Sequence, residues 1–260
     1  NRFECYSNKT ATFLALGKEC TRNCGFCDID FSKAPQAPEA DEPDRIALSV
    51  KELGLKHVVI TMVARDDLED GGAHHIAAII QRIREENKGV TIEVLTSDFH
   101  GSKAALDTVL QTKPDVFNHN IETVARLQRA VRPSAGYARS LSVLAQAKAA
   151  GLITKTGFML GLGETAEEVA GLLHDLAAIG TDIVTIGQYL RPTGKHLPVV
   201  RWAEPAEFEH WADVGHSLGI GHVEASPLTR SSYHAREAAD AVSVSISVDS
   251  RSISRRVTCL

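Results

Sequence analysis

The chain has 260 residues, 43% of them hydrophobic, and a formal net charge of −5. This is enough apolar material for one large core or two small domains, and a near-neutral balance without a basic tract argues against nucleic-acid binding. No apolar run reaches the length of a membrane span and no signal-peptide pattern is present, so no membrane location is expected.

The cysteines indicate a reducing compartment. There are five, at positions 5, 20, 24, 27 and 259. An odd number with three crowded together does not suit a disulfide framework, so we expect a cytoplasmic protein. Because the first residue is not Met, we expect the true start to be missing, and a transit segment lost with it would make the protein mitochondrial.

A cysteine-rich loop directly follows the first predicted strand, an apolar run at 12–17. Cys20, Cys24 and Cys27 have C-x3-C-x2-C spacing, which brings three sulfurs to one centre. Iron–sulfur clusters are normally held by four cysteine thiolates. Three thiolates without a fourth nearby would leave one iron with an open coordination position. Since a small molecule can bind and be reduced there, the motif favours a catalytic cluster.

Other interpretations of this loop stay open at this point. Structural zinc needs four Cys or His ligands, usually in two separated pairs. Asp28 and Asp30 are poor substitutes, and the nearest downstream histidine is His57. A redox dithiol formed by the last two cysteines would leave Cys20 without a role, and bacterial ferredoxins use a different spacing.

Beyond the loop, strand patterns alternate with helix patterns. The predicted strands are 57–62, 90–95, 115–120, 154–160, 182–187 and 222–225. The predicted helices are 41–53, 73–86, about 102–110, 137–150, one that follows a capping box at 165–168, and 205–218. This order predicts an α/β fold with a parallel sheet and helices outside it. Periodicity does not decide whether the sheet is doubly wound or closed.

Glycines mark two of the strand-to-helix turns. Gly71 and Gly72 would let the backbone approach a ligand closely, although a tight turn with positive φ explains them equally well. Gly161 and Gly163 occupy a second turn of this kind. Both pairs are therefore candidates for ligand binding.

Polar side chains gather at the end of one predicted strand. Asn118, His119, Asn120 and Glu122 lie where the carboxyl end of a barrel strand would face an active site. The alternative is that the Asn and His side chains cap a helix that begins near Ile121.

Two further segments stand apart from the alternation. The loop 188–201 is long for an α/β connection and carries Arg191, Lys195 and His196, and long loops in compact domains are often functional. From Val242 the chain becomes repetitive and serine-rich, which predicts a disordered tail.

Eight motifs, in order along the chain, resemble lipoyl synthase, a family of radical S-adenosylmethionine (SAM) enzymes. The C-x3-C-x2-C loop with Phe26 before its last cysteine is the signature of the whole superfamily. The motifs are NxxEC at 1–5, TATF at 10–13, CTRxCxFC at 20–27, RDDLxDGGA at 65–73, FNHNIET at 117–123, GLGET at 161–165, TIGQYLxP at 185–192 and RSSYHA at 230–235. The match runs to about Ala239.

The resemblance implies a partial (β/α)6 barrel, TIM-like and of the radical SAM type. It implies three segments: 1–19, the remnant of an auxiliary-cluster segment with the first strand; 20–239, the barrel with a C-terminal ligand segment; and 240–260, the disordered tail. The implied enzyme is a sulfurtransferase that inserts sulfur at C6 and C8 of a protein-bound N6-octanoyl-lysine by 5′-deoxyadenosyl radical chemistry. The alternatives are another sulfur-inserting radical SAM enzyme and a non-catalytic iron–sulfur protein.

The implied cofactors are SAM and two [4Fe–4S] clusters. By resemblance, Cys20, Cys24 and Cys27 hold the cluster that binds SAM, while Cys5 and Ser232 are ligands of an auxiliary cluster that supplies sulfur. The implied SAM-binding residues are Phe26, Gly71, Gly72, Asn120, Glu122, Gly161 and Gly163. The implied partners are octanoylated lipoyl-domain proteins, namely the E2 subunits of 2-oxoacid dehydrogenases and the H protein of glycine cleavage. The electron donor would be of the ferredoxin or flavodoxin kind.

The sequence departs from the family at a few positions. The family holds its auxiliary cluster with a C-x4-C-x5-C motif, of which Cys5 would be the third cysteine. The first two would lie before Asn1, so we expect the chain as given to bind no auxiliary cluster in the family's way and to be inactive. From the residues alone, Cys5 is a buried or free thiol and Ser232 a helix N-cap. Met62 and Ser226 stand where the family more often has Ser and Gly.

Overall fold

The computed structural model describes residues 8–232 and 235–242. Their centre is a seven-stranded sheet in which every neighbouring pair of strands is parallel. Its strands are β1 (Thr10–Ala15), β4 (His57–Met62), β5 (Thr91–Leu95), β6 (Val116–Asn118), β7 (Ile153–Leu160), β8 (Ile183–Gln188) and β9 (His222–Ala225). They lie in the sheet in the order in which they occur in the chain, so the sheet winds in one direction and is not doubly wound.

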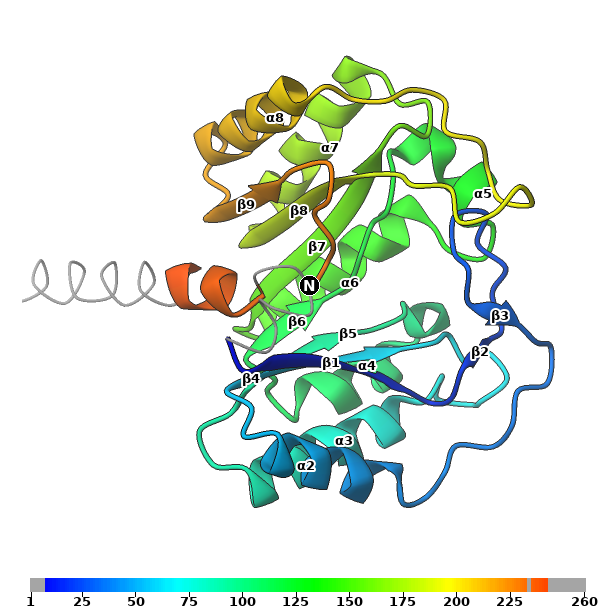
Figure 1. The fold of residues 1–260 in the computed structure, drawn as a ribbon, viewed down its shortest axis with the longest axis vertical. Coiled ribbons are helices and arrows are strands. Elements are labelled where there is room, and N and C mark those ends of the chain that lie inside the picture. Colours follow the sequence, from blue (N-terminus) through cyan, green and yellow to red (C-terminus); the bar gives the residue numbers. More distant parts are fainter. Residues whose placement is uncertain (1–7, 233–234, 243–260) are drawn as a thin grey trace, which may run out of the picture.

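The sheet is an open barrel. It curves, with its helices outside, and β1 and β9 form its two edges (Figure 1). Within the described residues these edges do not pair with each other. Six strand–helix units followed by a seventh strand confirm the predicted partial (β/α)6 barrel.

Between the first and the last strand of the sheet, the described chain forms seven α-helices and two short 3-10 helices. The α-helices are α2 (Glu42–Glu52), α3 (Ala73–Glu86), α4 (Lys103–Leu110), α5 (Gln128–Val131), α6 (Tyr137–Ala149), α7 (Ala166–Ala178) and α8 (Pro205–Ser217). The 3-10 helices are η1 (Phe99–Gly101) and η2 (Ala125–Leu127). Residues 235–242 are also helical.

Helical periodicity explains how these helices pack on the sheet. In α3, Ile76, Ile79, Ile80 and Ile83 recur every three or four residues and are all buried against the sheet. Fully burying one such side chain contributes about 1.5–3 kcal/mol. Within the residues that the structure describes, no helix is long and apolar enough to cross a membrane.

The concave face of the sheet is partly polar. Ile92 and Val94 of β5 belong to the apolar core, so Glu93 between them faces the opposite side, because successive strand residues alternate. Its carboxylate lies 3.1 Å from the ammonium of Lys155 on β7, and both side chains are fully buried. The amide of Asn118 on β6 donates to the same carboxylate at 2.8 Å. This cluster ties three neighbouring strands together inside the barrel.

Candidate active site

A small two-stranded sheet closes the base of the cysteine loop. β2 (Glu19–Cys20) pairs in parallel with β3 (Asp30–Phe31), so that Cys20 lies opposite Phe31. The three cysteines between these ends are free and half-buried. All three line one cavity of about 440 Å³, so the structure brings the predicted ligands together.

The first half of the loop is bound to the segments that follow β4 and β5. The Thr21 backbone N–H and hydroxyl both donate to the Ala64 carbonyl, at 3.0 and 2.9 Å. The buried Arg22 guanidinium donates to the Asp66 carboxylate at 2.7 Å and to the Asp98 carboxylate at 2.6 Å. These bonds fix the backbone beside Cys20 against two strand ends.

The second half is held by the long loop between β8 and α8. The His196 Nε2 lies 3.0 Å from the Cys27 carbonyl, and since a carbonyl only accepts, the ring nitrogen donates. The Leu197 N–H donates to the Gly25 carbonyl at 2.9 Å, and the Gly25 N–H donates to the Val131 carbonyl at the same distance. A Cβ on Gly25 would come within 2.9 Å of the Leu197 side chain. The loop predicted to be functional therefore packs on the cysteines.

Burial of the Cys24 and Cys27 thiols favours their neutral form. Burial raises the pKa of Cys24 to about 11, although the positive charge of Arg132 opposes this. Burial likewise raises the pKa of Cys27. Because a thiolate is the metal ligand, cluster assembly here must release protons.

The donor set fits an iron–sulfur cluster better than zinc. Cys20, Cys24 and Cys27 are the only cysteines among the described residues, and no three His, Cys, Asp or Glu side chains there, these cysteines included, are grouped closely enough to hold a single ion. His57 is fully buried 3.8 Å from Glu93 and does not line the cavity. Cys20 shares the cavity with the other two thiols, which the dithiol interpretation does not explain.

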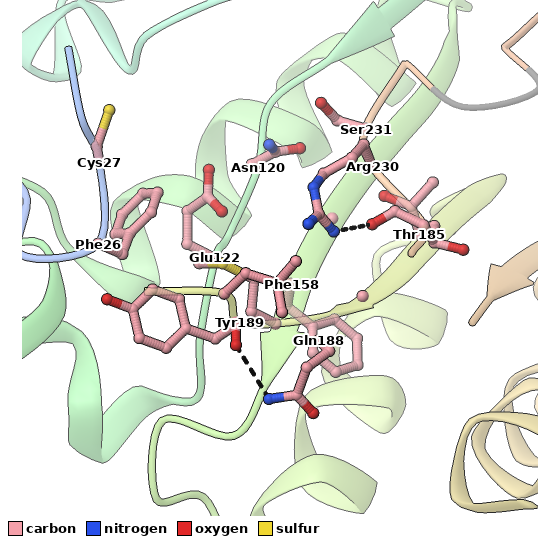
Figure 2. A pocket seen from close by; sticks show the side chains of 15 residues that line it. Phe26, Cys27, Asn120, Glu122, Phe158, Thr185, Gln188, Tyr189, Arg230 and Ser231 are labelled. Atoms are coloured by element: carbon pink, nitrogen blue, oxygen red, sulfur yellow. Dashed lines mark hydrogen bonds between the residues drawn. The ribbon is translucent and has the colours of Figure 1, made fainter. Parts of the chain in front are cut away.

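A second cavity, of about 300 Å³, adjoins the first. Phe26, Cys27, Asn120 and Glu122 line both, so four of the residues predicted from the sequence lie between the two spaces. Figure 2 shows the Phe26 and Tyr189 rings and the Glu122 and Asn120 side chains around this space. Further lining comes from Thr185, Gln188, Thr229, Arg230 and Ser231.

Glu122 occupies an unusual backbone position at the junction of the cavities. Its φ is +66°, in the left-handed region that non-glycine residues rarely adopt. Bonds to β7 hold it there: its N–H donates to the Gly157 carbonyl and its carbonyl accepts from Met159, both at 2.9 Å. Burial raises the pKa of Glu122, with Arg132 and Asn120 opposing the shift. Strain of this kind is typical of functional sites.

The alternative that this segment caps a helix near Ile121 is wrong. No helix begins there, because the backbone pairs with β7 through Glu122 and Phe158 instead. His119 is buried, and its Nδ1 lies 2.9 Å from the Thr96 carbonyl, so Nδ1 carries the proton. Its Nε2 then accepts from the Ser140 hydroxyl at 2.9 Å. Burial lowers the pKa of His119 to about 4, so the ring is neutral at pH 7.

The predicted glycines lie outside both cavities. Gly71 and Gly72 have positive φ, and a Cβ on Gly72 would lie 2.5 Å from the Leu16 side chain. Gly71 lines a separate hollow of about 280 Å³ with Asp66, Glu69 and His100. At Gly161, with φ of +98°, a Cβ would meet the Arg201 carbonyl at 2.6 Å. The space at Gly161 is therefore taken by the β8–α8 loop of this chain.

The remaining predicted ligands lie near the second cavity or outside the described residues. Ser232 is a half-buried turn residue next to Ser231, which lines that cavity. Cys5 and the part of the serine-rich tail beyond residue 242, with Cys259, lie outside the described residues.

Sequence reasoning missed Arg132, which lines the cysteine cavity with 7% of its surface exposed. The only feature of the local sequence that could have drawn attention to it is the Arg-Pro pair that follows α5. It also missed residues 61–64 at the end of β4, which line the same cavity. They could have been found from their place at the carboxyl end of a buried strand, where ligands bind in α/β folds.

Comparisons with known proteins agree with this geometry. Residues 14–176 match the family model of the Radical SAM superfamily. A protein from Protochlamydia amoebophila named lipoyl synthase is 56% identical over 239 residues, which is 90% of this chain and 74% of that protein. Lipoyl synthases from Rubrobacter xylanophilus and Chlorobium chlorochromatii are 54% and 52% identical, over 90% of this chain and 73% and 80% of theirs.

Solved structures share the fold at low sequence identity. Streptococcus suis SuiB bound to S-adenosylmethionine superposes with a TM-score of 0.65 and 14% identity, over 82% of this chain and 49% of SuiB. Methylornithine synthase, PylB, gives 0.60 and 15%, over 85% of this chain and 73% of PylB. These similarities establish the partial barrel independently of the sequence motifs.

Proposed function

The chain belongs to the lipoyl synthase family of the radical SAM superfamily, and on this premise we propose which of its residues carry out the reaction. It is a sulfurtransferase that inserts sulfur at C6 and C8 of a protein-bound N6-octanoyl-lysine and uses SAM and [4Fe–4S] chemistry. One observation carries the assignment of residues: three free thiols share a cavity that adjoins a second, aromatic-lined one.

Cys20, Cys24 and Cys27 hold the cluster that binds SAM. When bound, cluster and SAM together supply a radical able to abstract hydrogen from unactivated carbon, which no protein side chain can do. The chain's own contribution is to fix the three sulfurs. Thr21 and Arg22 hold the loop from one side, and His196 holds it from the other.

The nucleoside of SAM occupies the second cavity. Phe26 and Tyr189 offer aromatic surface for a planar base, and Glu122 and Asn120 offer polar atoms to hydroxyl or amino groups. The Asn120 side-chain oxygen is buried and has no hydrogen-bond partner among the described residues, which supports a ligand there. Gly161 and Gly163 support this site indirectly, since they admit the β8–α8 loop beside it.

Cys5 and Ser232 are ligands of an auxiliary cluster that supplies the sulfur. Two contacts support this: the Asn8 side chain donates to the Glu237 carboxylate at 2.7 Å, and Arg236 donates to the Asn8 carbonyl at 3.3 Å. The chain three residues after Cys5 therefore lies beside the chain four residues after Ser232. An oxygen ligand at Ser232 would release its iron more readily than a thiolate.

The protein substrates are octanoylated lipoyl domains, of which we propose the E2 subunits of 2-oxoacid dehydrogenases and the glycine cleavage H protein. A ferredoxin or flavodoxin donates the electrons. Pull-down of the reconstituted enzyme with each octanoylated domain tests the proposed protein substrates. The same domain without the acyl group is the control, and we expect it to bind less enzyme.

SAM cleavage tests the assignment of the cysteines. We expect the anaerobically reconstituted chain with dithionite to form 5′-deoxyadenosine, and Cys24→Ala to form none. Lys33→Ala, an exposed change in the same segment, serves as the matched control. Cleavage retained by Cys24→Ala would refute the assignment, and iron analysis together with circular dichroism of both variants separates loss of the cluster from loss of the fold.

A further inference from the structure

Two buried arginines line the cysteine cavity, and they differ in one respect. Arg22 forms ion pairs with Asp66 and Asp98 at 2.7 and 2.6 Å. Arg132, 7% exposed, has no carboxylate within ion-pair distance among the residues that the structure describes. Its guanidinium is thus a buried positive charge without an ion-pair partner in the described chain, and the Glu122 carboxyl of the same cavity attracts it only from beyond that distance.

The hydrogen bonds of Arg132 go to neutral groups. Its Nη1 donates to the Ile121 carbonyl at 3.0 Å and to the Ser140 hydroxyl oxygen at 3.3 Å. Ser140 in turn donates to the neutral His119 ring. Burying an unpaired ion costs several kcal/mol, and neutral acceptors offset only part of this. A negative charge in the cavity would offset the rest.

We propose that Arg132 raises the reduction potential of the cluster held by Cys20, Cys24 and Cys27, and so makes it easier to reduce. This inference rests on the proposed function. A [4Fe–4S] core of charge 2+ with three thiolates carries a net charge of −1. One electron from a low-potential one-electron donor takes it to −2, with no bond made or broken. A nearby fixed cation stabilises the second state more than the first.

Arg132 is a positioning residue in this account, since it acts on the reaction through the cluster. Arg22 cannot replace it, because two carboxylates already compensate the Arg22 charge. A different role is that Arg132 binds the carboxylate of SAM. That role predicts weaker SAM binding in a variant, with the potential of the SAM-free cluster unchanged.

The test is a potentiometric titration of the SAM-free, reconstituted enzyme, followed by electron paramagnetic resonance. Arg132→Gln removes the charge and keeps a donor, Arg132→Lys keeps the charge, and Arg139→Gln removes a partly exposed charge that does not line the cavity. We expect the reduction equilibrium constant of Arg132→Gln to fall about tenfold, equivalent to a midpoint ~59 mV lower for a one-electron couple. The other two variants should stay near the wild type.

The proposal would be overturned if the reduction equilibrium constant of Arg132→Gln stayed within twofold of the wild-type value. It would also be overturned if Arg132→Lys showed the same fall as Arg132→Gln. Arg132→Met is the second uncharged variant. If neither uncharged variant takes up iron while Arg132→Lys does, Arg132 serves cluster assembly and the proposal also fails. If the wild-type protein itself shows no cluster signal, the proposed function fails instead, so the two failures are distinguishable.

Discussion

Replacing Arg22 with Met should destabilise the protein through the loss of a buried ion pair. The guanidinium makes three hydrogen bonds of 2.6–2.8 Å to the Asp66 and Asp98 carboxylates, and the Asp98 side chain is fully buried. Removing one partner of a buried pair costs about 3–5 kcal/mol. Arg139 still lies 3.2 Å from Asp98, so we expect a loss of about 3 kcal/mol.

Anaerobic urea unfolding of the reconstituted protein, followed by tryptophan fluorescence, measures this loss. Arg82→Met is the matched control, since Arg82 also pairs with carboxylates but at the exposed surface, and its change should be small. Asp98→Asn in the Arg22→Met background should recover part of the stability, because the uncompensated charge is then gone. A loss below about 1 kcal/mol, or strict additivity of the two changes, would show that Arg22 and Asp98 do not form a stabilising buried pair.

The same pair makes stability depend on pH. Burial raises the pKa of Asp98, but Arg22 and, to a smaller extent, other positive groups such as Arg139 together outweigh burial, so the net effect lowers the pKa below its ordinary value. A carboxyl with a lowered folded-state pKa stabilises the protein above its unfolded pKa of about 3.9, and this stabilisation is lost as the pH falls through the folded value. Arg22→Met should therefore lose less stability on acidification than the wild type does.

Four further substitutions test other parts of the fold, each by urea unfolding. Thr165→Ala removes the confirmed capping box of α7 and should cost about 1 kcal/mol. Gly161→Ala places a Cβ against the β8–α8 loop at positive φ and should cost about 1–3 kcal/mol and expose that loop to trypsin. Gly171→Ala, in open space within α7, should instead stabilise by up to about 1 kcal/mol. Lys155→Met leaves the buried Glu93 carboxylate without its ammonium partner, which should cost about 3–5 kcal/mol.

Local patterns were sufficient to predict most of the elements. The predicted helix 73–86 and the predicted strands 57–62 and 222–225 match α3, β4 and β9 residue for residue. Apolar periodicity and flanking glycines act within a few residues, so sequence alone reveals them. The order of strands depends on contacts between distant segments, which explains why periodicity left a doubly wound sheet open as an alternative.

The site shows the same division between local and distant information. Cysteine spacing identified the loop, because all three thiols lie within eight residues. It did not reveal that His196 binds the Cys27 carbonyl from 169 positions away. The helix considered near Ile121 was wrong because Glu122 pairs with β7, a tertiary contact that overrides local capping preference. Arg132 was missed because its burial beside the cysteines follows from packing alone.

Mass spectrometry of an octanoyl-lysyl peptide measures whether this protein inserts sulfur into an octanoyl chain. The peptide is incubated anaerobically with SAM, reductant and the reconstituted chain, extended ahead of Asn1 by the two further cysteines of the C-x4-C-x5-C motif. We expect the peptide to gain two sulfur atoms, and to gain none with the Cys24→Ala form of the same protein. A peptide left unchanged by an enzyme with both clusters assembled would contradict the account.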